Sequence, residues 1–451
     1  MTKTFPDLSG LTEALLDAAK TAGAEAADAL AVDGTSISID ALDGRLEHAE
    51  RAEGIEVGLR VLIGHRQACV SASDTRAETF REMADRAVAM AREAPEDPTI
   101  GLADPDMLSA RRDAAMLDLS DPAPEPAPAD LEDDALRAEA AARAVNGVSK
   151  VQSASAAYGR RRIHLAATNG FSGGYERTDR SRSAVAITGE GAGMERDWYA
   201  DTRVYGSDLL SPEDIGRLAG ERTAARAGAR KPPTGSFPVI FEERISSSLI
   251  AHLLQAVSGT AVARGSTFLR DAMGEAVLPK GISLVEEPLR PRAGGSRPFD
   301  AEGLETRDRL IVGDGVLMGW TLDLGTARKL GLESTANASR GTSSPPAPSV
   351  TNVRLTEGDK SLDELLADVG TGLLVTSLIG STINPTTGDY SRGASGIWVE
   401  NGERAYPVNE CTIAGNLRDM LQGLVPANDA RHHLSRVVPS LLVEGLTVAG
   451  G

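Results

Sequence analysis

The sequence has few cysteines and no long apolar segment. Its two cysteines, Cys69 and Cys411, lie far apart in the chain and do not form a disulfide framework, which suits a reducing compartment. No uncharged apolar run is long enough to span a bilayer. Residues 1–23 carry acidic side chains at helical spacing, not the basic start and apolar block of a signal peptide. We therefore expect a cytoplasmic protein that does not enter a membrane.

Basic residues are also in deficit, with 47 Lys and Arg against 65 Asp and Glu and a net charge of −18. Sequence-independent binding of nucleic acid needs a positively charged surface, so we expect no nucleic-acid partner. The short basic run Arg160–Arg162 is interpreted as a solvated strand end.

The length of 451 residues indicates two domains. In residues 1–230, Ser9 is expected to cap a helix that Gly23 ends, and the alternating stretch Ile55–Ile63 predicts a half-buried strand. A second helix follows Asp74. These patterns predict an α+β domain with one layer of helices on an antiparallel sheet. The Pro-rich segment 121–130 is interpreted as an extended surface linker within it.

The second domain, residues 236–451, is predicted to be rich in β-structure. It follows the breaker-rich segment 231–235 and contains one longer helix near 242–258. Ser361 and Glu364 have the spacing of a capping box, and the segment 439–451 reads as a closing strand.

A hairpin at 396–408 is the strongest local signal in this domain. Asn401-Gly402 between two strand-like runs predicts a type I′ turn, and Pro407 predicts that the second strand is an edge strand or is interrupted there. Much glycine before an exposed strand suits the close approach of another backbone, although an ordinary hairpin explains it equally well. The candidate contacts with substrate or partner are Asp389, Tyr390, Ser391, Gly393, Gly396, Trp398, Asn401, Gly402 and Pro407.

The residues from Ser381 to Leu417 follow a long ordered pattern: S-x-I-N-P-x-T-G-D-Y-S-x-G-A-x-G-x-W-x-E-N-G, then Y-P-V, then T-I-A-G-N-L. This order resembles the C-terminal signature of the TldD/PmbA family. Members of that family resemble zinc metallopeptidases and work as a TldD–TldE pair. The version at Thr412–Leu417 resembles the PmbA/TldE branch.

The resemblance also identifies a missing metal motif. TldD-type members carry H-E-x-x-x-H, in which two histidines hold zinc and the glutamate activates water. The corresponding positions here are Leu254, Gln255 and Gly259, and no cysteine follows Cys411 to serve as the family's C-terminal ligand. None of the six histidines has a partner at four-residue helical spacing. We therefore expect no catalytic residue and no metal in this chain, and zinc in its partner.

Two further stretches are similar to the family, 297–303 (RPFDAEG) and 327–331 (ARKLG). They are explained either as turns held by Asp300 and Glu302 or as the lining of a substrate passage.

The resemblance implies a PmbA/TldE-like subunit of a heteromeric zinc metallopeptidase that cleaves unfolded or small polypeptides. The chain would shape the substrate cavity, and a TldD-like partner would carry zinc. Two alternatives stay open: a self-sufficient homodimeric metallopeptidase, and a non-enzymatic regulatory protein of the gyrase-modulator type. Chelator-sensitive activity of the chain alone would favour the first, and a stable complex with gyrase would favour the second.

Overall fold

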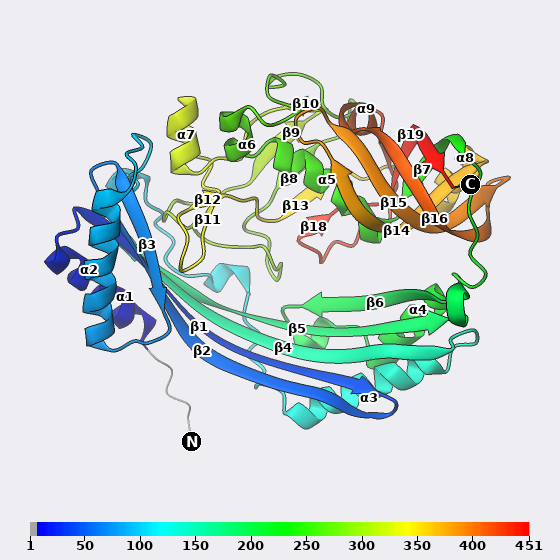
Figure 1. Ribbon diagram of the computed structural model, residues 1–451, viewed down its shortest axis with the longest axis horizontal. Helices are drawn as coiled ribbons and strands as arrows, with labels where there is room; N and C mark the ends of the chain where they lie inside the picture. The colour runs from blue at the N-terminus through cyan, green and yellow to red at the C-terminus, as the bar shows by residue number, and fades with distance from the viewer. Residues whose placement is uncertain (1–6, 451) are drawn as a thin grey trace.

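A six-stranded antiparallel sheet forms the base of the molecule in the computed structural model, which describes residues 7–450 (Figure 1). Its strands run in the order β3-β2-β1-β4-β5-β6. They are β1 (Ala26–Leu42), β2 (Arg45–Ile63), β3 (Arg66–Ala72), β4 (Lys150–Ala167), β5 (Ser172–Thr188) and β6 (Glu195–Arg203).

Strand alternation gives this sheet one helix-covered face. Odd-numbered residues of β1, such as Ala29 and Ile37, are buried beneath helices, and even-numbered residues such as Leu30 and Ser36 point to the other face. The pairs α1–α2 and α3–α4 cover the two ends of the same convex face (Figure 1). The helices are α1 (Leu8–Ala22), α2 (Ala77–Glu93), α3 (Pro128–Arg143) and α4 (Pro212–Ala224).

Several predicted boundaries in this half differ from the structure. Gly23 does end α1, with φ of +97° and its N–H bonded to the helix carbonyls, but Asp7 precedes the helix and Ser9 lies inside it. The run Arg160–Arg162, expected at a strand end, lies within one continuous strand, β4, because partner strands flank β4 on both sides of this run. The Arg160–Arg162 run is therefore in mid-strand and is not a strand end.

The predicted linker 121–130 is shorter than expected and is bound to the sheet. Pro128 already begins α3, because proline suits the first turn of a helix. Before it, the Asp121 carboxylate accepts the Gly206 N–H at 2.9 Å, and Glu125 pairs with Arg51 at 2.6 Å. These contacts hold residues 121–127 against the sheet, whereas the composition alone indicated an extended linker.

A second sheet closes on itself in the C-terminal half. Its order is β16-β15-β14-β7-β19-β17, and β16 also pairs with β19. Helix α5 (Glu243–Ala256) packs its apolar side against these strands. The strands are β7 (Gly235–Phe241), β14 (Gly372–Ile383), β15 (Asp389–Glu400), β16 (Glu403–Asn416), β17 (Val425–Pro426) and β19 (Leu441–Ala449).

A smaller sheet, β10-β9-β8-β13-β18, and several short elements complete this half. Ser361 caps α8 through the predicted capping box. The strands are β8 (Leu284–Glu286), β9 (Arg309–Gly313), β10 (Val316–Leu317), β11 (Ala338–Ser339), β12 (Ala347–Pro348), β13 (Val353–Leu355) and β18 (Arg436–Val437). The helices are α6 (Gly259–Arg264), α7 (Leu324–Leu330), α8 (Leu362–Val369) and α9 (Leu417–Gln422).

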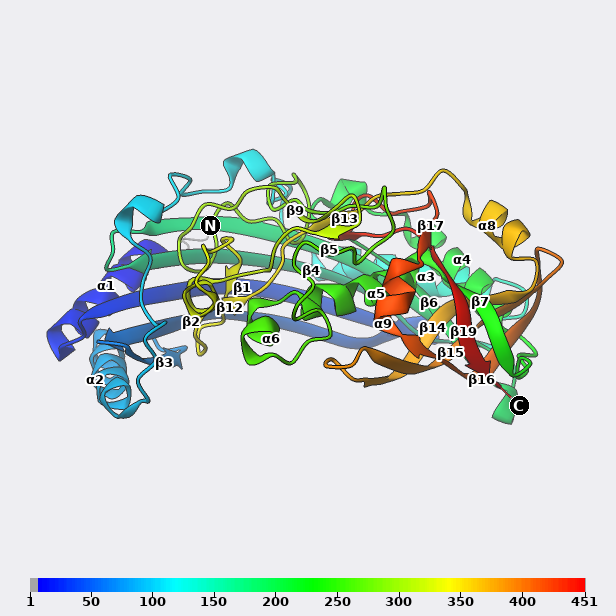
Figure 2. The same cartoon turned by 90° about the horizontal axis from the view of Figure 1, so that it is seen from above.

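The C-terminal half lies along the helix-free face of the large sheet (Figure 2). At one end of the sheet Arg340 pairs with Asp28, and at the other Arg226 donates to Ser395 at 2.8 Å. The predicted α+β class is confirmed, with helices and an antiparallel sheet followed by a β-rich region. Within residues 7–450, no helix has the length and apolar character needed to cross a bilayer.

Candidate functional site

The three positions expected to correspond to the zinc motif lie at the junction of α5 and α6. Leu254 is on the last turn of α5 and packs into the core, with 6% of its surface exposed. Gly259 begins α6, and a Cβ there would lie 2.6 Å from Thr326 Oγ1 and 2.7 Å from Leu322 Cδ2. Since even a methyl group does not fit, an imidazole at 259 has no room.

Gln255 is exposed and lines a cavity of about 310 Å³ beside α5, together with His252, Ile383 and Pro385. The His252 ring lies edge-on to Tyr390, 6.0 Å between centroids, and its Nε2 is buried without a hydrogen-bond partner. Burial, and secondarily Arg392, lowers the pKa of His252, so its imidazole is neutral at pH 7.

These residues do not make a zinc site. A neutral imidazole is a suitable ligand, but zinc needs three or four donors arranged around it. Among the residues that the structure describes, no three His, Cys, Asp or Glu side chains are grouped to hold a metal. Cys411 is buried, its Sγ donates to the Ala394 carbonyl, and burial raises its thiol pKa to about 11. That thiol is a packing group and not a nucleophile.

The predicted hairpin exists, but it does not offer the free edge that Pro407 suggested. Asn401 and Gly402 have φ of +54° and +80°, as the predicted type I′ turn requires. The outer side of β16 is occupied, because Arg230 N donates to the Pro407 carbonyl at 3.1 Å and Thr412–Ala414 pair with β19. The tail strand β19, predicted as a closing strand, returns to β16 and closes the sheet. Its pairing with β16 was not evident from the local sequence.

The nine candidate contact residues are consequently divided. Tyr390 and Trp398 are core residues, with only 2% of their surface exposed. Gly396 lies against β14, where a Cβ would meet the Leu374 carbonyl oxygen at 1.9 Å. Its glycine is therefore required by a neighbouring strand of the same chain. The others lie nearer the surface: Asp389, Ser391, Gly393, Asn401, Gly402 and Pro407.

A free backbone edge does exist one strand away, on β14. Residues 373–375 of β14 pair with β7, and within the described chain no strand continues that pairing from Thr376 to Ile383. Ile379, in the middle of this segment, has 70% of its surface exposed. The edge ends at Ile383, in the wall of the cavity that His252 and Gln255 line. A peptide could therefore pair with β14 beside the degenerate motif.

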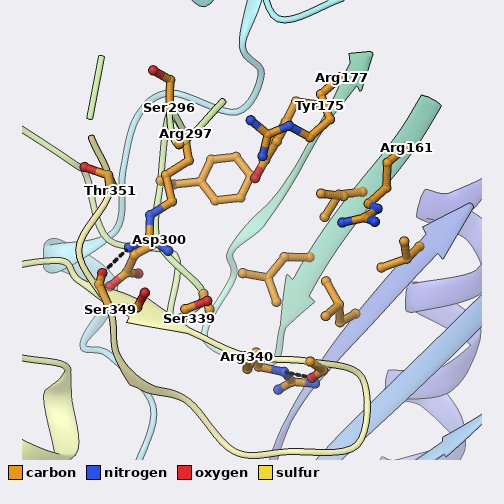
Figure 3. A pocket seen from close by; sticks show the side chains of 18 of the residues that line it. Arg161, Tyr175, Arg177, Ser296, Arg297, Asp300, Ser339, Arg340, Ser349 and Thr351 are labelled. Carbon is orange, nitrogen blue, oxygen red and sulfur yellow. Dashed lines mark hydrogen bonds between the residues drawn. The ribbon is translucent and has the colours of Figure 1, made fainter. Parts of the chain in front are cut away.

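A larger cavity, of about 550 Å³, lies between the N-terminal sheet and the C-terminal half (Figure 3). Its sheet-side wall is formed by even-numbered β1 residues and by odd-numbered residues of β4 and β5 such as Arg161 and Tyr175. The facing wall includes Arg297 and Asp300 from the RPFDAEG stretch. The size suits a small ligand or a few residues of a peptide.

The RPFDAEG stretch forms a turn and also contributes side chains to the wall of this cavity. The Asp300 carboxylate accepts the backbone N–H groups of Glu302, Leu304 and Ala338 at 2.9–3.0 Å, which fixes the turn. Arg297 and Phe299 line the large cavity. The ARKLG stretch forms the end of α7, away from that cavity. Burial, and next the Asp300 charge, raises the pKa of Glu302 to about 8.

Sequence reasoning did not identify the sheet-side residues of this cavity. Arg161, Tyr175 and Arg177 come from β4 and β5, far from the C-terminal signature in the chain. Their common face follows from strand alternation, but what covers that face is set by the packing of the two halves. The basic run Arg160–Arg162 was the available signal, but it was interpreted as a solvated strand end and so was not expected to face a cavity.

Comparison with known proteins finds one family along nearly the whole chain. Its models match residues 27–91 ("PmbA/TldA metallopeptidase domain 1"), 121–227 ("central domain") and 234–450 ("C-terminal domain"). Metalloprotease PmbA of Escherichia coli O157:H7 is 36% identical over 420 residues, covering 92% of this chain and 90% of the relative. The Metalloprotease PmbA homolog of Haemophilus influenzae is 34% identical, with 92% and 90% covered.

Two crystal structures show the same fold. One, from Bacteroides thetaiotaomicron and described as a candidate modulator of DNA gyrase, superposes with a TM-score of 0.89 at 27% identity, covering 98% of each chain. The other, TldE from Thermococcus kodakarensis, gives a TM-score of 0.84 at 20% identity, with 97% of this chain and 99% of that chain covered.

Proposed function

Because this chain belongs to the PmbA/TldD metallopeptidase family, we propose that it is a PmbA/TldE-type subunit of a heteromeric zinc metallopeptidase. In this proposal it shapes the substrate cavity, and a TldD-like partner in the cytoplasm supplies zinc. The observation that carries the proposal is the environment of Gly259, where Thr326 and Leu322 fill the space that a metal-binding imidazole would need. Neighbouring side chains occupy the space at position 259, so mutation of Gly259 alone would not restore a histidine ligand.

The chain's own contribution is to hold an extended polypeptide. The unpaired edge of β14 can donate and accept main-chain hydrogen bonds irrespective of the peptide's sequence. The cavity between the two halves offers apolar and charged side chains that suit a few residues of a peptide. Such recognition requires an unfolded or short polypeptide, because the backbone groups of a folded protein are already paired.

The partner's contribution is the chemistry that this chain cannot supply. Hydrolysis by a zinc peptidase needs a metal held by several protein donors and a carboxylate that takes a proton from bound water. Leu254 has no donor atom, and the amide of Gln255 is no base at neutral pH. The proposal therefore assigns peptide-bond cleavage to the complex and not to this chain alone.

Co-expression with a TldD-like chain that has an intact H-E-x-x-x-H motif tests the proposal. We expect a stable complex that contains zinc and cleaves a flexible fluorogenic peptide until a chelator is added. Replacing the glutamate of the partner's motif should abolish cleavage, whereas Gln255→Ala in this chain should leave zinc content and kcat unchanged.

Two results would contradict the proposal. Chelator-sensitive cleavage by this chain alone would favour a self-sufficient homodimer. Failure to bind the TldD-like chain, together with a persistent complex with gyrase, would favour a regulatory binding protein.

A further inference from the structure

Two arginines face one another in the wall of the large cavity. Arg161 of β4 lies directly opposite Arg177 of β5 in the antiparallel register. Both side chains project from the sheet toward the C-terminal half (Figure 3). Like charges at directly opposite positions destabilise a sheet, so the chain carries an unfavourable contact here unless an anion lies between them.

Hydrogen bonds within the protein offset the repulsion between Arg161 and Arg177 only in part. Arg177 donates to the Gly294 carbonyl at the rim of the cavity. Arg161 is exposed, and within residues 7–450 the structure gives it neither a hydrogen bond nor an ion pair. Its five N–H donors are therefore available to a ligand.

Two more guanidinium groups add positive charge to the same cavity. Arg297 donates to the carbonyls of Ala338 and Ser349, each at 2.9 Å, while its Nε is buried without a partner. The Arg340 side chain is fully buried and bonded to Asp28, and its Nη2 is also buried without a partner. Buried donors without acceptors are costly, so the surrounding protein satisfies neither of these guanidinium groups completely.

The acidic residues of the cavity are already engaged. Asp300 accepts three backbone N–H groups, and Glu56 accepts the Thr342 hydroxyl at 2.5 Å. Four arginines against two carboxylates make the lining positive in a chain whose net charge is −18. Apolar side chains lie between them: Leu30, Val32, Ile163, Leu165, Tyr175, Phe299 and Val350.

We propose that this cavity binds a carboxylate group of the peptide substrate between Arg161 and Arg177, with apolar side chains of the peptide beside it. The inference rests on the proposed function for the identity of the ligand as a peptide. Planar guanidinium groups match a carboxylate through paired N–H donors. The carboxylate can be the peptide's C-terminus or an aspartate or glutamate side chain, and both present the same chemistry.

The test compares three fluorescent peptides of otherwise identical sequence: one with a free C-terminus and an internal glutamate, one with an amidated C-terminus, and one with glutamine in place of glutamate. Anisotropy measures binding to the full-length chain, and KM and kcat are measured with the zinc-containing complex. The variants are Arg161→Ala, Arg161→Gln and Arg177→Ala. Arg86→Ala, on the exposed face of α2, is the charge-matched control.

We expect Arg161→Ala and Arg177→Ala to weaken binding of the free-acid peptide roughly 10-fold to 100-fold, as for loss of a charge-assisted hydrogen bond. KM should rise correspondingly with little change in kcat. One of the two neutralised peptides, either the amidated one or the glutamine one, should bind weakly to the unaltered chain, and this identifies the carboxylate that is recognised. The Arg161 variants should not weaken the binding of that peptide further. Arg86→Ala should change nothing.

Folding does not confound this result, because removing one of two facing like charges should leave the unfolding temperature unchanged or raise it. Equal binding of all three peptides, or unchanged binding by the Arg161 and Arg177 variants, would overturn the carboxylate site even if the complex cleaves peptides. An inactive complex whose full-length chain still shows carboxylate-dependent binding would refute the proposed peptidase role and leave the site standing.

Discussion

Asp28 and Arg340 form a buried ion pair that joins the N-terminal sheet to the C-terminal half. The same carboxylate also accepts from Arg60 Nε at 2.6 Å, and both of these side chains of the sheet are 4% exposed. One aspartate therefore pairs with two buried guanidinium groups, one from each half of the molecule. The large cavity lies directly beside this junction, since Arg340 lines it.

Asp28→Asn should destabilise the fold strongly, because it leaves the buried Arg60 and Arg340 without the carboxylate that they share. Removing one partner of a buried ion pair costs about 3–5 kcal/mol. Chemical denaturation measures the change, with Arg217→Ala on the surface of α4 as the control, where we expect about 0.2–1 kcal/mol. An Asp28→Asn variant as stable as the control would show that Asp28 does not anchor the two halves.

Glu302 should make stability depend on pH. Burial raises its pKa from 4.5 to about 8, so between these values the folded state holds a proton that the unfolded state has released. The free energy of unfolding should therefore fall as pH rises from about 5 to about 8. Glu302→Gln stays neutral and its amide oxygen can accept the same Leu324 N–H, so the variant should gain stability relative to the unaltered chain across this range. A stability difference that is constant with pH would refute a neutral Glu302.

Gly396→Ala should destabilise the closed C-terminal sheet, because the Cβ of the alanine would overlap the Leu374 carbonyl oxygen on β14. We expect a loss of about 1–3 kcal/mol or more, as for overpacking in a closed core. Gly393→Ala is the matched control on the same strand, since its Cβ would lie 3.2 Å from the Ile379 carbonyl oxygen. Thermal unfolding compares the two, and equal tolerance of both changes would mean that β14 and β15 are not packed as described.

The purified chain alone should hold no stoichiometric zinc after exposure to the metal and removal of excess. Structural zinc sites in zinc-finger peptides gain on the order of 10–16 kcal/mol from several donors, and Leu254 and Gly259 supply none. Elemental analysis of the chain, with and without a TldD-like partner, makes the measurement. One tightly held zinc per chain that His252→Ala removes would contradict the expectation and identify His252 as a ligand.

Local sequence patterns determined much of this molecule. Asn401-Gly402 defines its turn because only a few residues accept positive φ, and Gly23 ends its helix for the same reason. The family follows from a signature that is contiguous in the chain. The expectation that Leu254 and Gly259 stand at the histidine positions of the zinc motif also comes from the sequence and stays a prediction.

Only the tertiary structure decided which strand edge is free and what surrounds the large cavity. Pro407 indicated an edge on β16, but the tail strand β19 pairs with β16. The edge without a neighbouring strand is instead on β14, beyond the residues 373–375 that pair with β7. Arg161 and Arg297 are 136 positions apart in number and line one cavity because the C-terminal half lies along the helix-free face of the sheet. Such contacts depend on packing between residues far apart in the chain, and no periodic pattern in the local sequence predicts them. They form only when the two halves of the molecule bury their surfaces against each other.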